Sequence, residues 1–199
     1  MQTFPQEVRL RDGTTVVLRP MQEGDLDRSH RFFRKLPEAD RLHLRMDLTD
    51  RANVRIRMEA TDALEHWRLI ALQGEEIVGD ATLHRPRYGW MRHTGEIRCI
   101  VARELQGRGL GGRLLNELFQ EATRRGVERL RAEVTPDETA ALRILERLGF
   151  HAELTLRDRR RGPDGVLRDV IVMTTHITQL WNRLADLMQA MDGEGRERH

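Results

Sequence analysis

The chain has 199 residues, of which 39% are hydrophobic and 33% are charged, and its formal net charge of +2 is nearly neutral. This length and balance are typical of one globular domain with an appendage, and they exclude a disordered or membrane-embedded chain. Lys35 is the only lysine, so 33 of the 34 basic residues are arginine. Genome base composition is the simplest interpretation of that excess.

Cys99 is the only cysteine, so the chain cannot form an internal disulfide. No apolar run approaches the roughly 18 residues that a membrane-spanning helix needs, and the first residues lack the pattern of a signal peptide. We therefore expect a protein of the reducing cytoplasm that has no membrane partner.

Apolar periodicity in the first half of the chain predicts a hairpin, several helices and a meander of strands. Asp12-Gly13 marks the hairpin turn, since this pair accepts the positive φ angles of a tight turn. Pro37 ends the first helix. In chain order, the predicted segments are the hairpin over 8–20, helices over 25–36, 38–45 and 51–59, and strands over 67–72, 77–83 and 94–101.

The second half alternates helices and strands and ends in an amphipathic segment. The predicted segments are a helix from 110 to a C-terminal cap at Gly126, a strand over 127–134, a helix over 139–148, and strands over 150–156 and 166–174. Residues 177–191 then predict a helix with one apolar face. We divide the chain into a domain over 1–176 and a C-terminal helix and tail over 177–199. Docking of that helix on its own domain is the preferred interpretation, and docking on a partner, including a homo-oligomer, stays open.

A glycine-rich turn joins the strand over 94–101 to the following helix. Its sequence is Gln106-Gly107-Arg108-Gly109-Leu110-Gly111-Gly112-Arg113. Backbone N–H groups at a helix N-terminus are unpaired and carry the positive end of the helix dipole, so glycines there let a pyrophosphate approach without obstruction. Arg108 and Arg113 add positive charge. The turn is therefore a candidate site for an acyl-coenzyme A.

The residues from Gln106 to Gly111 fit the signature Gln/Arg-x-x-Gly-x-Gly/Ala, and the order of strands and helices over 8–173 resembles the GNAT family of N-acetyltransferases. The segments 8–13, 18–20 and 145–150 look like the acetyltransferase domain of bacterial Pat-type protein lysine acetyltransferases. The resemblance implies an α/β fold with a mixed sheet, splayed central strands and flanking helices. It also implies acetyl-CoA as co-substrate and a protein lysine as acceptor.

The same resemblance assigns roles to particular positions. Backbone groups of Cys99, Ile100 and Val101 are expected to bind the pantetheine arm and the thioester carbonyl, with an N–H near Ile100 stabilising the oxyanion. The glycine turn is expected to bind the pyrophosphate. Glu96 occupies the position of the general base in Pat-type enzymes, and a structural role beside Arg98 is the alternative.

A base is needed because the lysine pKa of about 10.4 leaves roughly one amine in 2,500 neutral at pH 7. Partial burial of Glu96 is expected to raise its pKa toward the working range. Two positions depart from the family pattern, since Leu145 replaces a tyrosine general acid and Glu138 replaces an asparagine. A small-molecule amine acetyltransferase and a non-catalytic acyl-CoA sensor therefore stay open as alternatives.

Four other sequence patterns give weaker indications of function. Cys99 lacks the setting of a nucleophile, and the histidine spacing predicts no metal site. The basic run over 157–161 has no interleaved aromatics, so we expect no nucleic-acid partner. The turn also satisfies Gly-x-Gly-x-x-Gly, with Glu133 as a candidate ribose ligand, but its first glycine lies too far from the strand for a dinucleotide fingerprint.

Overall fold

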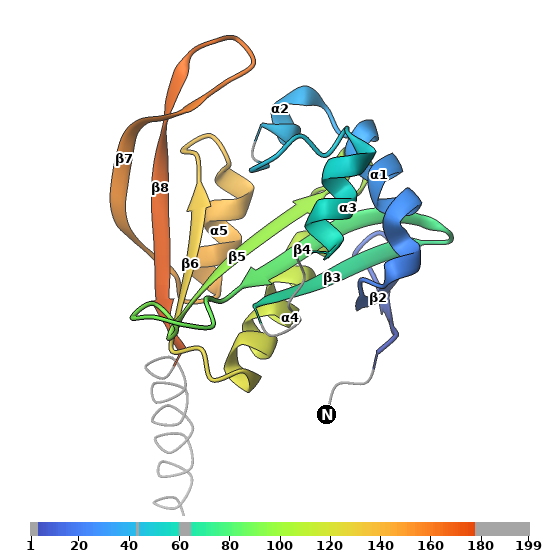
Figure 1. Cartoon of the computed structure of the whole chain (residues 1–199), viewed down its shortest axis with the longest axis horizontal. Coiled ribbons are helices and arrows are strands. Elements are labelled where there is room, and N and C mark those ends of the chain that lie inside the picture. The colour runs from blue at the N-terminus through green and yellow to red at the C-terminus, as the bar shows by residue number, and fades with distance from the viewer. Residues whose placement is uncertain (1–3, 43, 60–64, 178–199) are drawn as a thin grey trace, which may run out of the picture.

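The computed structural model describes residues 4–42, 44–59 and 65–177. These residues form one mixed sheet with helices on both faces (Figure 1). The strands are β1 (Gln6–Arg9), β2 (Thr15–Pro20), β3 (His66–Gln73), β4 (Glu76–His84), β5 (Thr94–Val101), β6 (Arg129–Val134), β7 (His151–Arg161) and β8 (Leu167–His176). The helices are α1 (Leu26–Lys35), α2 (Glu38–Arg41), α3 (Arg51–Glu59), α4 (Leu110–Arg124) and α5 (Thr139–Arg147), with 3-10 turns η1 (Glu23–Asp25) and η2 (Arg103–Leu105).

The strand order is β1-β2-β3-β4-β5-β6-β8-β7. Neighbouring strands are antiparallel except β5 and β6, which pair in parallel. The predicted meander of three strands is confirmed as β3, β4 and β5. A single parallel pair in the described sheet does not provide the series of parallel strands on which a dinucleotide-binding fold is built.

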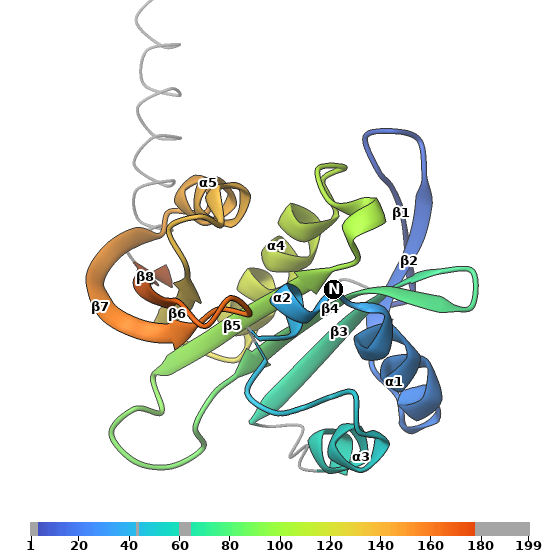
Figure 2. The same ribbon diagram turned by 90° about the horizontal axis from the view of Figure 1, so that it is seen from above.

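Helices α4 and α5 cover one face of the sheet and α1 to α3 lie on the other (Figure 2). The predicted apolar stripe of α4 is buried, with Leu110, Leu114 and Leu118 fully excluded from solvent. Gly79 on β4 allows this close packing, because a Cβ there would lie 2.9 Å from a methyl group of Leu114. The helix that follows the glycine turn is thus anchored on the central strands.

The central strands part after a short contact. β5 and β6 pair only at three positions, ending with Glu96 opposite Arg131. β5 continues to Val101 and β6 to Val134, and the two ribbons diverge over that length (Figure 1). The expected splay is confirmed, and Glu96 is the last β5 residue before it opens.

Most predicted elements are confirmed, with differences at their ends. The helix predicted over 38–45 is a single turn, α2, because its few residues bury no side chain that would extend it. Strand β7 continues to Arg161, so the basic run belongs to a hairpin arm. Ile177 is buried and donates its N–H to the carbonyl of Glu128. The rest of the predicted C-terminal helix lies outside the described residues.

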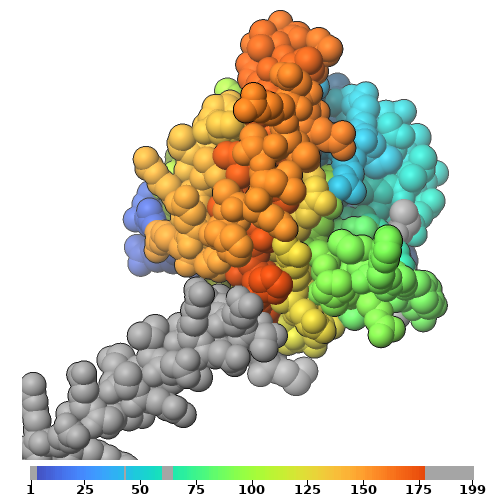
Figure 3. Space-filling model, turned by 90° about the vertical axis from the view of Figure 1, so that its left-hand side faces the viewer, coloured from blue at the N-terminus to red at the C-terminus, as the bar shows by residue number. Residues whose placement is uncertain are grey.

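The β7–β8 hairpin forms the upper part of one side of the molecule, and the green loop between β4 and β5 projects at its lower right (Figure 3). Two aromatic side chains of this loop are exposed, Tyr88 at 75% and Trp90 at 90%. Among the described helices, none is long and apolar enough to cross a membrane.

Candidate functional site

The glycine turn leaves a series of backbone donors free. Gly107 and Gly109 have φ angles of +74° and +96°, which side-chain-bearing residues rarely adopt, and Gly109 is the N-cap of α4. The first helical hydrogen bond runs from the Arg113 N–H to the Gly109 carbonyl at 3.1 Å. Within the described part of the chain, no backbone N–H from 107 to 112 donates a hydrogen bond. These six donors, with the helix dipole behind them, suit a phosphate group.

Two further glycines in the turn are not required by the fold. Gly111 and Gly112 do not have positive φ, and a Cβ at either would lie no closer than 3.8 Å to the side chains of Val101 and Ile144. Glycine costs up to about 1 kcal/mol relative to alanine within a helix. Their presence in the first turn of α4 leaves the backbone N–H groups there uncovered by side chains of their own.

Side chains around the turn attach it to its neighbours. The Gln106 amide donates to the Val101 carbonyl at 3.0 Å, which joins the turn to the end of β5. Arg108 pairs with Asp12 in the β1–β2 hairpin, and Arg113 lies 3.4 Å from Glu117 on α4. Both arginines that were expected to add charge thus have carboxylate partners in this structure.

Arg11, which the sequence did not indicate as a site residue, also lies beside the turn. Its N–H donates to the Arg108 carbonyl at 3.1 Å, and its side chain passes 3.5 Å from the position of a Cβ on Gly109. No hydrogen bond or ion pair within the described residues engages its guanidinium. Only the packing of the β1–β2 hairpin on the turn reveals this residue.

The end of β5 presents backbone groups toward the splay. The Ala102 N–H donates to the Val78 carbonyl on β4 at 2.9 Å. Because antiparallel strands pair through alternate residues, Ile100 is also turned to β4, and the N–H groups of Cys99 and Val101 point to the side where β6 has parted. The expectation of an oxyanion donor at Ile100 therefore shifts to its two neighbours.

Cys99 is partly buried and packs against the core. Burial, together with the negative charge of Asp80, raises its pKa to about 12. Because the thiolate is the reactive form, this cysteine has no nucleophilic role at neutral pH. The sequence-based interpretation of Cys99 as a packing residue agrees with this position.

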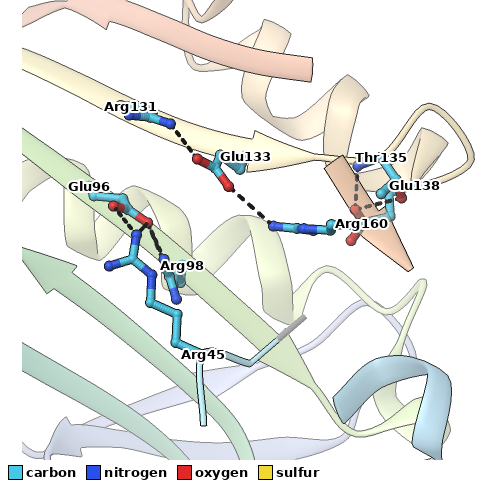
Figure 4. A network of polar contacts seen from close by, with 8 residues as sticks. All are labelled: Arg45, Glu96, Arg98, Arg131, Glu133, Thr135, Glu138 and Arg160. Carbon is cyan, nitrogen blue, oxygen red and sulfur yellow. Dashed lines mark hydrogen bonds and ion pairs between the residues drawn. The ribbon is translucent and has the colours of Figure 1, made fainter. Parts of the chain in front are cut away.

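Glu96 lies at the vertex of the splay, with its carboxylate held by two arginines (Figure 4). Arg45 approaches its two oxygens at 2.9 and 2.8 Å, and Arg98 on the same strand also donates to it. Arg45 is 63% exposed, whereas Glu96 is 15% exposed. A cationic side chain that arrives from solvent thus reaches a partly buried carboxylate.

The expectation that burial raises the pKa of Glu96 is wrong in its net direction. Burial alone does raise it, but the hydrogen bond and charge of Arg98, followed by the charges of Arg45 and Arg131, lower the pKa below its usual value of 4.5. Glu96 is therefore ionised at neutral pH. It is a proton acceptor whose strength depends on which cations stand beside it.

The other arm of the splay carries a second charged cluster. Glu133 on β6 pairs with Arg131 and lies 3.5 Å from Arg160 on β7, which joins the hairpin to this strand (Figure 4). Glu133, considered above as a ribose ligand, is thus held in a strand-to-strand network. The sequence offers no local signal for the contact with Arg160, because that residue lies on a separate strand, whereas Arg131 is two residues from Glu133 on β6.

The two departures from the family pattern have structural roles. Leu145 is 2% exposed and packs in the core. The Glu138 carboxylate accepts hydrogen bonds from the Thr135 N–H at 2.6 Å and the Thr135 hydroxyl at 2.9 Å, so it orders the turn before α5. Neither side chain supplies a general acid.

Two histidines lie on the sheet beside Glu96. His84 on β4 is paired with Glu96 on one side and with His66 on β3 on the other. Burial, then the neighbouring charges of His84 and Arg68, lowers the pKa of His66 to about 4. Burial also lowers the pKa of His84, although the charge of Glu96 opposes this shift. Both imidazoles are neutral at pH 7.

Residues 27–150 match the model of the acetyltransferase (GNAT) family. The chain belongs to this family. It is 29% identical over 156 residues to acetyltransferase Pat of Mycolicibacterium smegmatis, a match that covers 73% of this chain and 44% of that protein. The chain thus spans less than half the length of this relative.

Solved GNAT structures share the fold. The GNAT domain of S. lividans PAT superposes with a TM-score of 0.69 at 23% identity, covering 86% of this chain and 96% of that one. yncA from Salmonella typhimurium, solved with its cofactor acetyl-CoA, superposes with a TM-score of 0.70 at 21% identity, covering 81% and 94%. At these identities the likeness shows the GNAT fold alone.

Proposed function

We propose that this chain is an acetyl-CoA-dependent N-acetyltransferase that modifies lysine side chains of proteins. One observation carries the proposal: a partly buried carboxylate lies on β5 where this strand begins to part from β6, and six backbone N–H groups that donate to no described residue follow the end of the same strand. Family membership and the relative named acetyltransferase Pat support the same activity.

The residues present fit acetyl-CoA at the glycine turn. The N–H groups over 107–112 suit its pyrophosphate, and the N–H groups of Cys99 and Val101 suit the arm that leads to the thioester. Acetyl-CoA, when bound, supplies a thioester carbonyl that an amine can attack. The Val101 N–H then stabilises the negative charge that develops on the carbonyl oxygen.

The acceptor is proposed to be a long cationic side chain because one already reaches Glu96. Arg45 extends from the segment after α2 to the carboxylate, with most of its own surface in solvent. A lysine on a protein surface has nearly the same reach and the same charge. Its ammonium would replace the Arg45 guanidinium on Glu96.

Glu96 is proposed as the general base, with a condition set by its neighbours. Its neighbours hold the pKa of Glu96 below its usual value, whereas the pKa of a lysine is about 10.4, so complete proton transfer before attack is unfavourable. Because an ammonium nitrogen has no free electron pair, the small neutral-amine fraction attacks the thioester carbonyl. Glu96 then accepts the further proton that nitrogen loses once it is bonded to carbon, and the C–S bond breaks to release the coenzyme A thiolate. Displacement of Arg45 also raises the pKa of Glu96 and strengthens the base.

The test uses labelled acetyl-CoA with a panel of lysine-bearing proteins and, separately, polyamines. Because Lys35 is the only lysine, a Lys35→Arg background has no side chain that the enzyme can label on itself by the proposed reaction. Arginine keeps the ion pair with Glu76 that Lys35 makes at 2.8 Å. Glu96→Gln is compared with Glu104→Gln, an exposed control on η2.

Label on proteins, reduced about 10²- to 10⁴-fold in Glu96→Gln and unchanged in Glu104→Gln, supports the whole proposal. Equal transfer by wild type and Glu96→Gln removes Glu96 as the base. Transfer to polyamines alone identifies a small-molecule enzyme. Calorimetric binding of acetyl-CoA without any transfer identifies a sensor, and absence of binding contradicts the site itself.

A further inference from the structure

Strand pairing brings three metal-ligating side chains together away from the glycine turn. His66 begins β3 and His84 ends β4, and the two are paired in register. Glu65 immediately precedes His66. One ligand atom from each of these residues lies within 4.8 Å of those of the other two.

The two imidazoles are available as ligands. Their rings stack with centroids 4.5 Å apart and planes inclined by 24°. Neither ring makes a hydrogen bond within the described residues, and both side chains are half-buried. The Glu65 carboxylate accepts a single weak bond, from the Arg87 N–H at 3.3 Å. Partial burial restrains the three side chains and leaves one side open to water.

We propose that Glu65, His66 and His84 form a binding site for a divalent transition-metal ion of the zinc type. Two imidazole nitrogens and one carboxylate oxygen are a ligand set that suits zinc, cobalt or nickel better than magnesium or calcium. A water molecule completes four coordination. The site is separate from the glycine turn, and binding here does not depend on acetyl transfer.

The geometry requires a small adjustment. Ligand atoms around a tetrahedral zinc are about 3.4 Å apart, so the side chains must close by at most about 1.4 Å. Rotation of half-buried side chains at strand ends allows such a movement without shifting the paired backbone. The ring planes must also tilt apart, because stacked rings do not direct two nitrogens to one point.

The charged side chains around the three ligands lower the affinity of the site for a metal cation. Arg57 and Arg68 lie near His66, and Arg45 and Arg98 lie near His84, so four guanidinium groups oppose a cation. Glu65 and Glu96 oppose that effect. Because two of the arginines are themselves paired with Glu96, the net repulsion is smaller than the count of arginines indicates.

The spacing of histidines in the sequence predicts no metal site, and the reason is topological. His66 and His84 are separated by a complete hairpin and meet only because β3 pairs with β4 in this register. No short motif contains both residues.

The test is a calorimetric titration of the full chain, free of any affinity tag, with ZnCl₂, and a matched absorption titration with CoCl₂. We expect one ion bound per chain and cobalt bands characteristic of low coordination number. His66→Gln and His84→Gln are each expected to weaken zinc binding at least about tenfold. His151→Gln, an exposed histidine on β7, is expected to bind as wild type does.

Circular dichroism and thermal unfolding of each variant show that it is folded before binding is compared. The proposal is overturned if wild type binds no zinc, or if the double variant His66→Gln/His84→Gln binds zinc as tightly as wild type. Equal binding of magnesium and zinc would also overturn it, because such a site would lack the proposed imidazole ligands.

Discussion

Arg45 donates to both carboxylate oxygens of Glu96, at 2.9 and 2.8 Å, from the segment between α2 and α3. This contact places a cation where the proposed acceptor ammonium must sit. It also lowers the pKa of Glu96, so Arg45 affects both access to the carboxylate and its basicity. Under the proposed function, Arg45 competes with the acceptor.

Arg45→Ala is therefore expected to raise kcat/KM for a cationic acceptor about two- to fivefold, the equivalent of the ~0.5–1 kcal/mol of an exposed ion pair. Loss of the guanidinium raises the pKa of Glu96, so the acid limb of the pH–rate profile moves to higher pH. Initial rates against pH measure both effects. Arg55→Ala, an exposed control on α3, should leave them unchanged. A fall in kcat/KM would show that Arg45 assists the reaction.

Gly111→Ala is expected to weaken acetyl-CoA binding without lowering the thermal stability of the protein. The added methyl makes only ordinary contacts, 3.8 Å from Val101 and 3.9 Å from Ile144, so thermal stability should stay equal or rise slightly. Acetyl-CoA affinity should fall about tenfold, or ~1.4 kcal/mol, because the methyl occupies the approach to the amides. Calorimetry and thermal unfolding measure the two quantities.

Gly126→Ala provides the opposite control. Gly126 has a φ of +67° at the C-terminal end of α4, so alanine there should lower stability by about 1 kcal/mol and leave acetyl-CoA binding unchanged. If both variants lose affinity in proportion to stability, the turn has no specific role in binding.

Arg11→Gln tests the cation that the β1–β2 hairpin brings to the turn. Its guanidinium lies beside Gly109, and no carboxylate among the described residues pairs with it, whereas Arg108 is paired with Asp12. We expect acetyl-CoA affinity to fall about tenfold at low salt, and the difference from wild type to shrink as salt is raised. Binding isotherms at two salt concentrations measure this. Arg9→Gln, on the same hairpin, is the control, and an equal loss in both would indicate a general effect of charge.

Asp25 is expected to support stability at neutral pH. It is 1% exposed and accepts two bonds from Arg19 at 2.6 Å and one from the Gln22 N–H at 2.8 Å. Burial raises its pKa, but these partners outweigh burial and hold the pKa below 3.8. Asp25→Ala should cost about 3 kcal/mol, because it leaves Arg19 largely buried without its partner.

The sign of the pH dependence follows from that shift. Since the folded-state pKa lies below the unfolded value of 3.8, the stabilisation by Asp25 is present above that value and is lost as pH falls through the folded-state pKa. Urea unfolding at neutral pH and near pH 3 measures the free energy of unfolding of both proteins. The difference between wild type and Asp25→Ala should be smaller in acid. Asp27→Ala, at an exposed ion pair with Arg51, should show a much smaller effect. If the difference in free energy of unfolding between wild type and Asp25→Ala does not change with pH, the ionised Asp25 carboxylate is not the source of the stabilisation.

The order of elements and the glycine turn were predictable from the sequence because they depend on neighbouring residues. Apolar periodicity locates α4 and β5, and the glycines over 107–112 locate the turn, since helix packing and positive φ act over a few residues. Burial of Cys99 was predictable for the same reason. The position of Glu96 followed from the family resemblance, and its role stays a prediction.

Burial raises the pKa of Glu96, and its net direction depends first on Arg98, two residues along the same strand, whose hydrogen bond and charge lower it. The sequence places Arg98 there but does not show that its guanidinium turns to the carboxylate. The smaller lowering effects of Arg45 and Arg131 come from separate segments and were not predictable. The same limit applies to Arg11 beside Gly109.

The sequence by itself determined the order of helices and strands and the glycine turn, because hydrophobic periodicity and backbone conformation are properties of short segments; the splay was expected from the family resemblance. Tertiary structure alone brought Arg45 and Arg131 to Glu96 and brought His84 to Glu65 and His66. Charge–charge interactions and metal coordination depend on the distance between side chains in space. Strand register sets that distance for residues that are far apart in the sequence.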